Sequence, residues 1–307
     1  MLTEGARCES GCHTRLAGPL PMSVVETNLP NPGTFLPEPR TPRTPRTFGV
    51  QPMSSTPPPA DRPRPPRTAA VIPAAGRGVR LGPGAPKALR VLGGTPMLIH
   101  AIRAMAASRA VSLVVVVAPP DGAPEVKHLL DEHALPERTD YLVVPGGETR
   151  QESVRLGLEA LPEDVAVVLV HDAARPLVPV DTVDAVAAAV RDGAPAVVPA
   201  LPLADTVKEV EPAATPGEPE PVLTTPVRAR LRAVQTPQGF DRETLERAHA
   251  EVAVDGEGAT DDAGMVERLG RPVVVVPGHE EAFKVTRPLD LVLAEAVLAR
   301  RRANDGF

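Results

Sequence analysis

A glycine-rich segment from Ala74 to Lys87 contains the residues best suited to hold phosphate groups. Four glycines in these fourteen residues leave backbone N–H groups unshielded, and such groups can surround an anion. Arg77, Arg80 and Lys87 add positive charge to the same stretch. The segment follows an aliphatic run that predicts a strand, and ligands of open α/β sheets bind at the carboxyl ends of strands. We therefore expect it to bind a phosphorylated ligand.

Two common phosphate loops are excluded by the details of this segment. A Rossmann dinucleotide fingerprint requires a third glycine where Leu81 stands, and an acidic residue about twenty positions later. No acid occurs between Lys87 and Asp121. A Walker A loop requires Gly-Lys-Ser/Thr, whereas Lys87 lies between Pro86 and Ala88. The remaining alternatives are another nucleotide-binding loop and a flexible connection without function.

Lysine is rare in this chain, which has four lysines and twenty-nine arginines. A lysine in such a chain suggests that a compact ammonium is needed rather than a planar guanidinium. The four positions are Lys87, Lys127, Lys208 and Lys284. Three of them, all except Lys127, fall within motifs that other observations single out.

Alternating aliphatic runs and amphipathic segments must position these residues. Short buried strands are predicted at 69–73, 112–118, 141–144, 165–170 and 194–199. Helical spacing occurs near 95–107, 124–134, 149–161 and 181–192, with Asp181 as the expected N-cap of the last. This alternation predicts an α/β fold, a mostly parallel twisted sheet with helices on both faces.

The alternation stops between residues 201 and 234, where two short strand patterns flank a Pro/Glu-rich turn at 211–221. An isolated hairpin is only marginally stable, so we expect this β-arm to pack against a second subunit. Beyond it we predict helices near 241–254, 261–269 and 288–302, and strands near 272–277 and 282–286. Thr286 is the expected cap of the closing helix, with Pro288 in its first turn.

Residues 1–68 differ in composition from the remainder of the chain, residues 69–307. They contain fifteen of the 39 prolines and a short repeat, Arg40-Thr-Pro-Arg-Thr-Pro-Arg-Thr47. Proline is excluded from helix and sheet interiors, and the segment offers little apolar surface, so it is predicted to be disordered. Its alternative role is that of a docking ligand for a partner.

Charge and composition limit the class of protein. The net charge is -6, and an acidic chain argues against broad nucleic-acid binding. No apolar run approaches the ~18 residues that a membrane helix needs. The two cysteines, Cys8 and Cys12, form no recognised metal motif by themselves. A cytoplasmic protein without nucleic-acid or membrane partners is expected.

Several ordered motifs within residues 70–303 resemble the 2-C-methyl-D-erythritol 4-phosphate cytidylyltransferases of the non-mevalonate isoprenoid pathway. The motifs are Pro73-Ala-Ala-Gly-x-Gly-x-Arg80 with Pro86-Lys87, Gly146-Gly-Glu-Thr-Arg-Gln-Glu-Ser153, Val170-His-Asp-Ala-Ala-Arg-Pro176, Asp205-Thr-Val-Lys208, Gln235-Thr-Pro-Gln238, Ala259-Thr-Asp-Asp262 and Phe283-Lys-Val-Thr-Arg-Pro288. Their joint order and spacing make the resemblance specific. It leaves residues 1–68 and the Pro/Glu-rich tip of the arm without a counterpart.

The resemblance implies a Rossmann-like nucleotidyltransferase fold and transfer of CMP from CTP to a phosphorylated polyol, with Mg²⁺ and release of pyrophosphate. By the same resemblance, Arg80 and Lys87 hold the triphosphate, and Lys284 reaches the α-phosphate. These three are the expected catalytic residues. In-line phosphoryl transfer is helped by preorganised cations and metal ions and needs no covalent nucleophile, so these residue types suit the reaction.

The resemblance also assigns nucleotide-binding and substrate-binding residues. Those matching nucleotide contacts are Ala74, Ala75, Gly76, Gly78, Gly146, Gly147, Glu148 and Ser153. Those matching substrate contacts are Asp172, Arg175, Thr206, Arg228 and Thr236. Thr206 and Arg228 lie in the arm, and in the family they reach the neighbouring subunit's site, which implies a homodimer.

Some roles stay open at the level of sequence. Asp172 can bind substrate hydroxyls or hold Mg²⁺, directly or through water, so the metal ligands are unknown. Arg175 can grip phosphate or pair with Asp172, while His171 is expected to be structural. Asp261 and Asp262 suit the first turn of a helix, where the dipole favours acids.

Two rival functions are consistent with parts of this pattern. The first is a nucleotidyltransferase on the same scaffold that serves another polyol, a sugar phosphate or a molybdenum cofactor. The second is a non-catalytic protein that recruits partners through its Pro-rich tail.

Overall fold

The aliphatic runs form one mixed sheet in the computed structural model, which describes residues 67–76, 86–133, 135–251 and 261–305. Its strand order is β10-β7-β11-β6-β1-β4-β5, and β12 also pairs with β7. The strands are β1 (Arg67–Pro73), β4 (Val111–Ala118), β5 (Asp140–Pro145), β6 (Val165–Val170), β7 (Ala196–Pro202), β10 (Arg232–Val234), β11 (Gln238–Asp241) and β12 (Val273–Pro277).

The centre of the sheet is parallel, as the sequence predicts. Strand β1 pairs in parallel with β4 and β6, and β4 with β5. Val71 and Ile72 of β1 have no exposed surface, because helices cover both faces of the sheet. Strand β11 is inserted antiparallel between β6 and β7. The sequence did not predict it, since Gln238-Gly-Phe-Asp241 is short and half polar.

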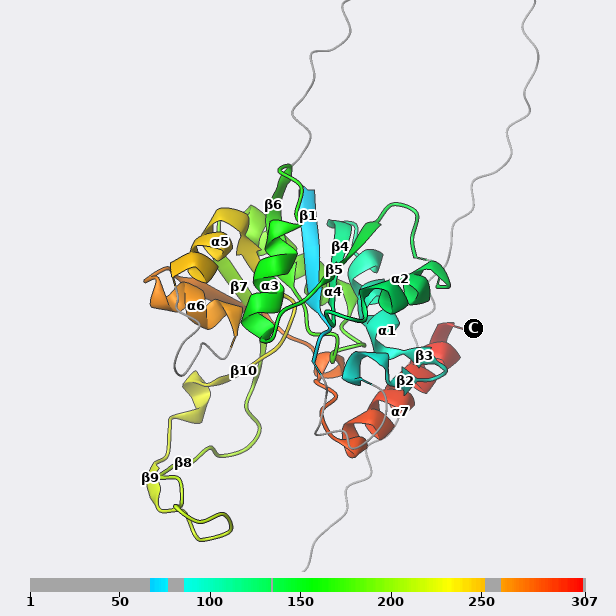
Figure 1. Ribbon diagram of the computed structural model, residues 1–307. Coiled ribbons are helices and arrows are strands. Elements are labelled where there is room, and N and C mark those ends of the chain that lie inside the picture. The colour runs from blue at the N-terminus through cyan, green and yellow to red at the C-terminus, as the bar shows by residue number, and fades with distance from the viewer. Residues whose placement is uncertain (1–66, 77–85, 134, 252–260, 306–307) are drawn as a thin grey trace, which may run out of the picture. The chain divides into compact units, whose positions relative to one another are not determined.

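In the described part of the chain, seven α-helices pack on the sheet or beside it (Figure 1). They are α1 (Met97–Ala107), α2 (Ala123–Asp131), α3 (Arg150–Glu159), α4 (Val180–Arg191), α5 (Arg242–Glu251), α6 (Asp262–Arg268) and α7 (Pro288–Asp305). Helices α1, α2 and α4 contribute to the core on one face, and α3, α5 and α6 to the core on the other. The predicted α/β architecture with helices on both faces is confirmed.

Short elements connect the end of β1 to α1. The 3₁₀ helix η2 (Lys87–Leu89) is followed by a hairpin of β2 (Val91–Leu92) and β3 (Thr95–Pro96). Leu92 and Met97 pack with Val285 and Ala294 in a third apolar cluster. The beginning and the end of the described chain therefore share a core, which places the segment before α7 beside the end of β1.

Three sequence-based predictions about local structure were wrong. Strand β1 begins at Arg67 rather than at Ala69. Helix α4 begins at Val180 with Pro179 as its N-cap residue, so Asp181 lies inside the first turn. The expected strand at 282–286 is instead the end of the 3₁₀ helix η4 (Glu280–Ala282) and an irregular segment. That segment bonds to a loop: the Val285 N–H donates to the Ala174 carbonyl.

The predicted arm leaves the sheet after β7 and returns at β10 (Figure 1). Its strands β8 (Glu209–Val210) and β9 (Val222–Thr224) pair antiparallel, and the 3₁₀ helix η3 (Arg228–Arg230) follows. The apolar side chains of Val222, Leu223 and Val227 are 55%, 60% and 65% exposed. Within the described chain, no helix is long and apolar enough to cross a membrane.

Candidate active site

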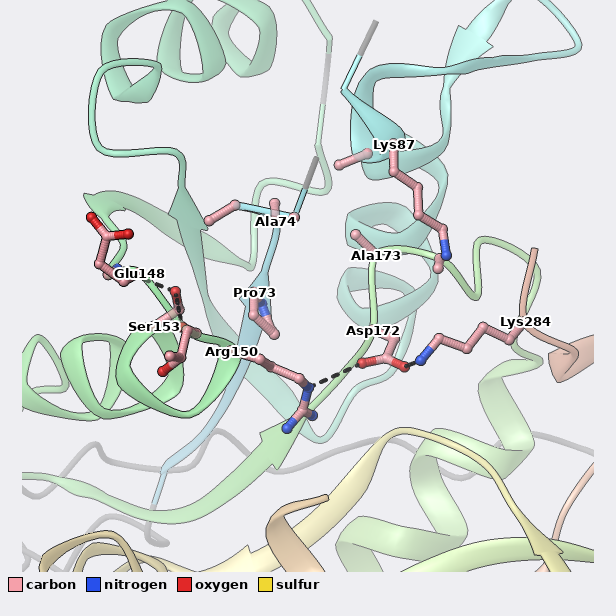
Figure 2. A pocket seen from close by; sticks show the side chains of 15 residues that line it. Pro73, Ala74, Lys87, Glu148, Arg150, Ser153, Asp172, Ala173 and Lys284 are labelled. Carbon is pink, nitrogen blue, oxygen red and sulfur yellow. Dashed lines mark hydrogen bonds and ion pairs between the residues drawn. The ribbon is translucent and has the colours of Figure 1, made fainter. Parts of the chain in front are cut away.

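A pocket lies at the carboxyl ends of β1 and β6 and collects most of the predicted site residues (Figure 2). Its lining includes Ala74, Ala75, Gly76, Lys87, Gly147, Glu148, Ser153, Asp172 and Lys284. The empty space is about 700 Å³, a figure that includes the open mouth. Arg80 and Gly78 lie outside the described residues.

The residues that follow β1 form one wall of the pocket. The Ala74 N–H donates to the Val117 carbonyl at 2.8 Å, and the side chain of Ala74 is buried. Small side chains at Ala74 and Ala75 leave room for a planar ligand group against this strand end. Lys87, in the first turn of η2, extends its ammonium toward the loop that carries Asp172 and Ala173 (Figure 2).

The loop between β5 and α3 forms the opposite wall. A Cβ on Gly146 would stand 2.9 Å from Ser153 Oγ and 3.0 Å from the Ala118 carbonyl oxygen, so only glycine fits without movement. Thr149 caps α3 by accepting the Glu152 N–H at 3.0 Å. Glu152 in turn accepts the Glu148 N–H at 2.8 Å. The loop is thus fixed by its own hydrogen bonds.

The hydroxyl of Ser153 is largely used within this loop. It accepts the Gly147 N–H at 3.2 Å and donates to the Thr149 carbonyl at 2.9 Å. Ser153 is 1% exposed. Its contribution to the site is therefore the shape of the Gly147–Glu148 backbone as well as any direct contact with a ligand.

Asp172 lies between two cations at the bottom of the pocket (Figure 2). Lys284 Nζ is 2.7 Å from its Oδ2, and Arg150 Nε is 3.6 Å from its Oδ1. Burial opposes ionisation of this carboxyl, but attraction to Arg150 and Lys284 outweighs burial and lowers its pKa to about 2. Asp172 is therefore a carboxylate at neutral pH.

Lys284 reaches Asp172 because backbone contacts hold its segment against the loop after β6. The Val285 N–H donates to the Ala174 carbonyl at 2.8 Å. On the other side of Lys284, the Arg175 guanidinium donates to the Ala282 carbonyl at 2.7 Å and to the Val234 carbonyl at 3.2 Å. These contacts favour a structural role for Arg175 over either role that the sequence left open.

Thr236 also acts on the loop after β6. Its hydroxyl oxygen accepts the Asp172 N–H at 3.1 Å and lies 3.0 Å from His171 Nδ1. The other ring nitrogen of His171 lies 3.1 Å from the Arg175 carbonyl, which can only accept. His171 therefore carries its proton on Nε2, and the Thr236 hydroxyl donates to Nδ1. Burial lowers the pKa of His171 to about 4, which agrees with a neutral, structural ring.

The two glutamines of Gln235-Thr-Pro-Gln238 tether neighbouring segments, a role that the motif alone did not reveal. Gln235 pairs with both backbone groups of His279, at 2.9 and 3.0 Å. Gln238 accepts the Ala263 N–H at 3.2 Å and donates to Asp261 at 2.6 Å. The motif thus joins η4 and α6 to the sheet beside the pocket.

Gly146, Arg175 and Thr236 lie behind the pocket lining, whereas Thr206 and Arg228 are predicted site residues that the fold places on the arm. Both are exposed on the arm, and neither lines the pocket. Arg228 donates to the Ala204 carbonyl at 2.5 Å, which ties the two sides of the arm together. Their predicted role in a neighbouring subunit stays a prediction.

Arg150 lines the pocket and was absent from the predicted site residues. Besides Asp172 it contacts Asp262, with Nη1 2.8 Å from Oδ2 of that fully buried carboxylate. Asp262 stands in the first turn of α6, as the sequence suggested, but the fold also buries it completely. Both residues stand in motifs recognised in the sequence, but only the fold shows that α3 and α6 meet there.

The described residues contain no group of three His, Cys, Asp or Glu side chains able to hold a metal ion. Asp172 offers one carboxylate to the pocket, and its two oxygens face Lys284 and Arg150. This donor set fits a cation held mainly by a ligand's own phosphates, with Asp172 as an outer contact.

The charged cluster around Asp172 should make stability depend on pH. A carboxyl whose pKa is about 2 when folded and about 3.9 when unfolded stabilises the native state fully above about pH 5. This contribution, about 3 kcal/mol, is lost progressively as the pH falls from about 5 through 2. We measure the free energy of unfolding by urea titration at several pH values between about 5 and 2. As the pH is lowered, we expect this free energy to fall less steeply in Asp172→Asn than in the wild type. Equal slopes in the two proteins would contradict the cluster.

Comparisons with known proteins agree with this geometry. Residues 68–300 match the family described as "IspD: 2-C-methyl-D-erythritol 4-phosphate cytidylyltransferase". The enzyme of that name from Streptomyces coelicolor is 84% identical over 243 residues, which cover 79% of this chain and 89% of the relative. The counterpart from Frankia casuarinae is 57% identical, over 76% of this chain and 82% of its own length.

Solved structures give the same result. The 2-C-methyl-D-erythritol 4-phosphate cytidylyltransferase of Thermus thermophilus is 37% identical, with a TM-score of 0.57, over 74% of this chain and 97% of that one. The synthase from Anaerococcus prevotii has a TM-score of 0.64 at 27% identity, over 76% and 96% of the two chains. By sequence and fold, the chain belongs to the 2-C-methyl-D-erythritol 4-phosphate cytidylyltransferase family.

Proposed function

We propose that this protein transfers CMP from CTP to the phosphate of 2-C-methyl-D-erythritol 4-phosphate, giving 4-diphosphocytidyl-2-C-methyl-D-erythritol and pyrophosphate. Family membership supports this reaction. The observation that carries it in the molecule is the Lys284–Asp172 pair facing Lys87 and the 146–153 loop across one pocket. The same pocket is thus lined by cations suited to bind phosphate, by a carboxylate suited to bind hydroxyl groups and by a glycine-containing loop suited to bind a base.

The reaction needs charge neutralisation more than proton transfer. A phosphate oxygen of the acceptor forms a bond to the α-phosphorus of CTP, and the bond from that phosphorus to the β-phosphate oxygen breaks. Pyrophosphate leaves with the electron pair. Lys87 and Lys284 supply fixed positive charge where negative charge gathers. Arg80 belongs to the same proposal through the family motif.

The remaining groups position the two substrates. The backbone of Gly146, Gly147 and Glu148, shaped by Ser153, is suited to the donor and acceptor edge of cytosine. Asp172 is ionised and can accept hydrogen bonds from acceptor hydroxyls. Because Lys284 contacts Asp172, one ion pair links the acceptor's hydroxyls to the reacting phosphates.

We include Mg²⁺ in the proposal as a cation bound chiefly by the triphosphate. It would neutralise phosphate charge and orient the leaving group. Asp172 is the described pocket residue best suited to contact it, through water, because Lys284 and Arg150 already face both carboxylate oxygens.

We also propose that the active form is a homodimer. The arm carries exposed apolar side chains, including Leu223 and Val227, that a single chain leaves uncovered. Thr206 and Arg228 stand on this arm, away from their own pocket. An arm that crosses to a second copy would bring a hydroxyl and a guanidinium to the acceptor's phosphate.

A substrate panel tests the reaction. Pyrophosphate release is measured with Mg²⁺ and each nucleoside triphosphate against methylerythritol phosphate and other polyol, sugar and cofactor phosphates. We expect CTP with methylerythritol phosphate to give the highest kcat/KM. Turnover with another pair and none with this one would overturn the proposed substrates while leaving nucleotidyl transfer intact.

The lysines should be needed for chemistry. We expect Lys87→Ala and Lys284→Ala each to lower kcat/KM by about 10²- to 10³-fold, the usual effect of removing a group that stabilises transition-state charge. Lys127→Ala is the matched control, because Lys127 is exposed on α2 and pairs with Asp131. Full activity of Lys87→Ala would contradict the mechanism.

Subunit mixing tests the arm. Arg228→Ala and Lys284→Ala proteins, each nearly inactive, are denatured together in equal amounts and refolded. If arms cross, each heterodimer has one site with both defects and one with neither, so about a quarter of wild-type activity returns. Arms that serve their own pocket would give no recovery. Refolding each variant alone is the control.

A further inference from the structure

Asp262 is a buried carboxylate that the proposed reaction does not use. It has no exposed surface, and it does not line the pocket. Its Oδ1 lies 3.1 Å from His249 Nε2, and its Oδ2 lies 2.8 Å from Arg150 Nη1. Each carboxylate oxygen thus has one partner, and His249 comes from α5 while Arg150 comes from α3.

The position of Asp262 is fixed by the start of α6. Asp261 caps this helix by accepting the Gly264 N–H at 2.9 Å. Gln238 of β11 holds the same turn through Asp261 and the Ala263 N–H. The carboxylate of Asp262 is therefore anchored to the central sheet, and it cannot follow Arg150 if that side chain moves.

Arg150 is shared unequally between two carboxylates. Its contact with Asp262 is a close ion pair of 2.8 Å, whereas its nearest approach to Asp172 is 3.6 Å. An arginine next to a free carboxylate normally forms a two-pronged pair with it. Arg150 and Asp172 do not form such a pair here, and Oδ1 of Asp172 keeps hydrogen-bonding capacity for another donor.

We propose that Asp262, supported by His249, is a positioning residue that holds Arg150 back from Asp172 and so keeps Asp172 open to the hydroxyls of the polyol acceptor. The inference rests on the proposed function, since it assigns Asp172 to the acceptor. It also explains a buried charge, because a buried ion pair is seldom retained for stability when apolar residues would serve.

Suppression by a second substitution tests this role. In Asp262→Asn, Arg150 is released and pairs with Asp172, so KM for methylerythritol phosphate rises about tenfold, the scale of one charged hydrogen bond. We expect kcat and KM for CTP to change less than about threefold. Adding Arg150→Gln to this variant removes the competitor, and KM for the acceptor returns to within about threefold of wild type.

A merely structural role predicts the opposite of suppression. The double variant would then be worse than Asp262→Asn, and this result would overturn the inference, as would an unchanged acceptor KM in the single variant. The double variant replaces an ion pair by two neutral amides, so neither charge is left buried without its partner, and the protein is expected to fold. Thermal melting checks each protein.

Two further measurements complete the test. His249→Gln keeps a donor toward Asp262 and should resemble wild type, while His249→Leu should raise the acceptor KM about two- to threefold. A crystal structure of Asp262→Asn should place Arg150 within hydrogen-bond distance of both Asp172 oxygens. If Arg150 keeps its wild-type position in this variant, the inference is overturned, whatever the substrate panel shows about the proposed reaction.

Discussion

The ion pair between Asp172 and Lys284 is the contact on which the site depends. Asp172 follows β6 in the middle of the sheet, and Lys284 comes more than a hundred residues later, just before α7. Attraction to Arg150 and Lys284 together outweighs the burial of the carboxyl. The Val285–Ala174 backbone bond and the contact of Arg175 with the Ala282 carbonyl hold the two segments together. The cluster that α7 forms with the β2–β3 hairpin fixes the same arrangement from the other side.

A second layer of polar residues supports this pair without touching the pocket. Thr236 accepts the Asp172 N–H directly and donates to a neutral His171, and Gln235 holds the backbone at His279. Such contacts satisfy buried polar groups and at the same time fix the geometry of charged ones. Gln235 and Thr236 lie in the short connection between β10 and β11, and the pairing of β11 with β6 brings that connection beside the loop of Asp172.

Electrostatic balance in the pocket comes from competition as well as attraction. Asp172 is flanked by Lys284 and Arg150, while Arg150 is drawn toward the more deeply buried Asp262. A pocket that must receive two polyanions gains from cations that are held but not fully paired. The arrangement leaves both positive charge and an acceptor oxygen at the place where two substrates would meet.

The sequence by itself determined the strand–helix alternation and the family, because aliphatic periodicity and ordered motifs are local properties. It also identified Lys284 and Asp172 through those motifs. Only the tertiary structure decided that Arg175 holds carbonyl groups, that Asp262 is buried, and that residues 282–286 form no strand. Each of these outcomes depends on which distant backbone or charge lies nearby, and a spacing rule along one chain carries no information about that.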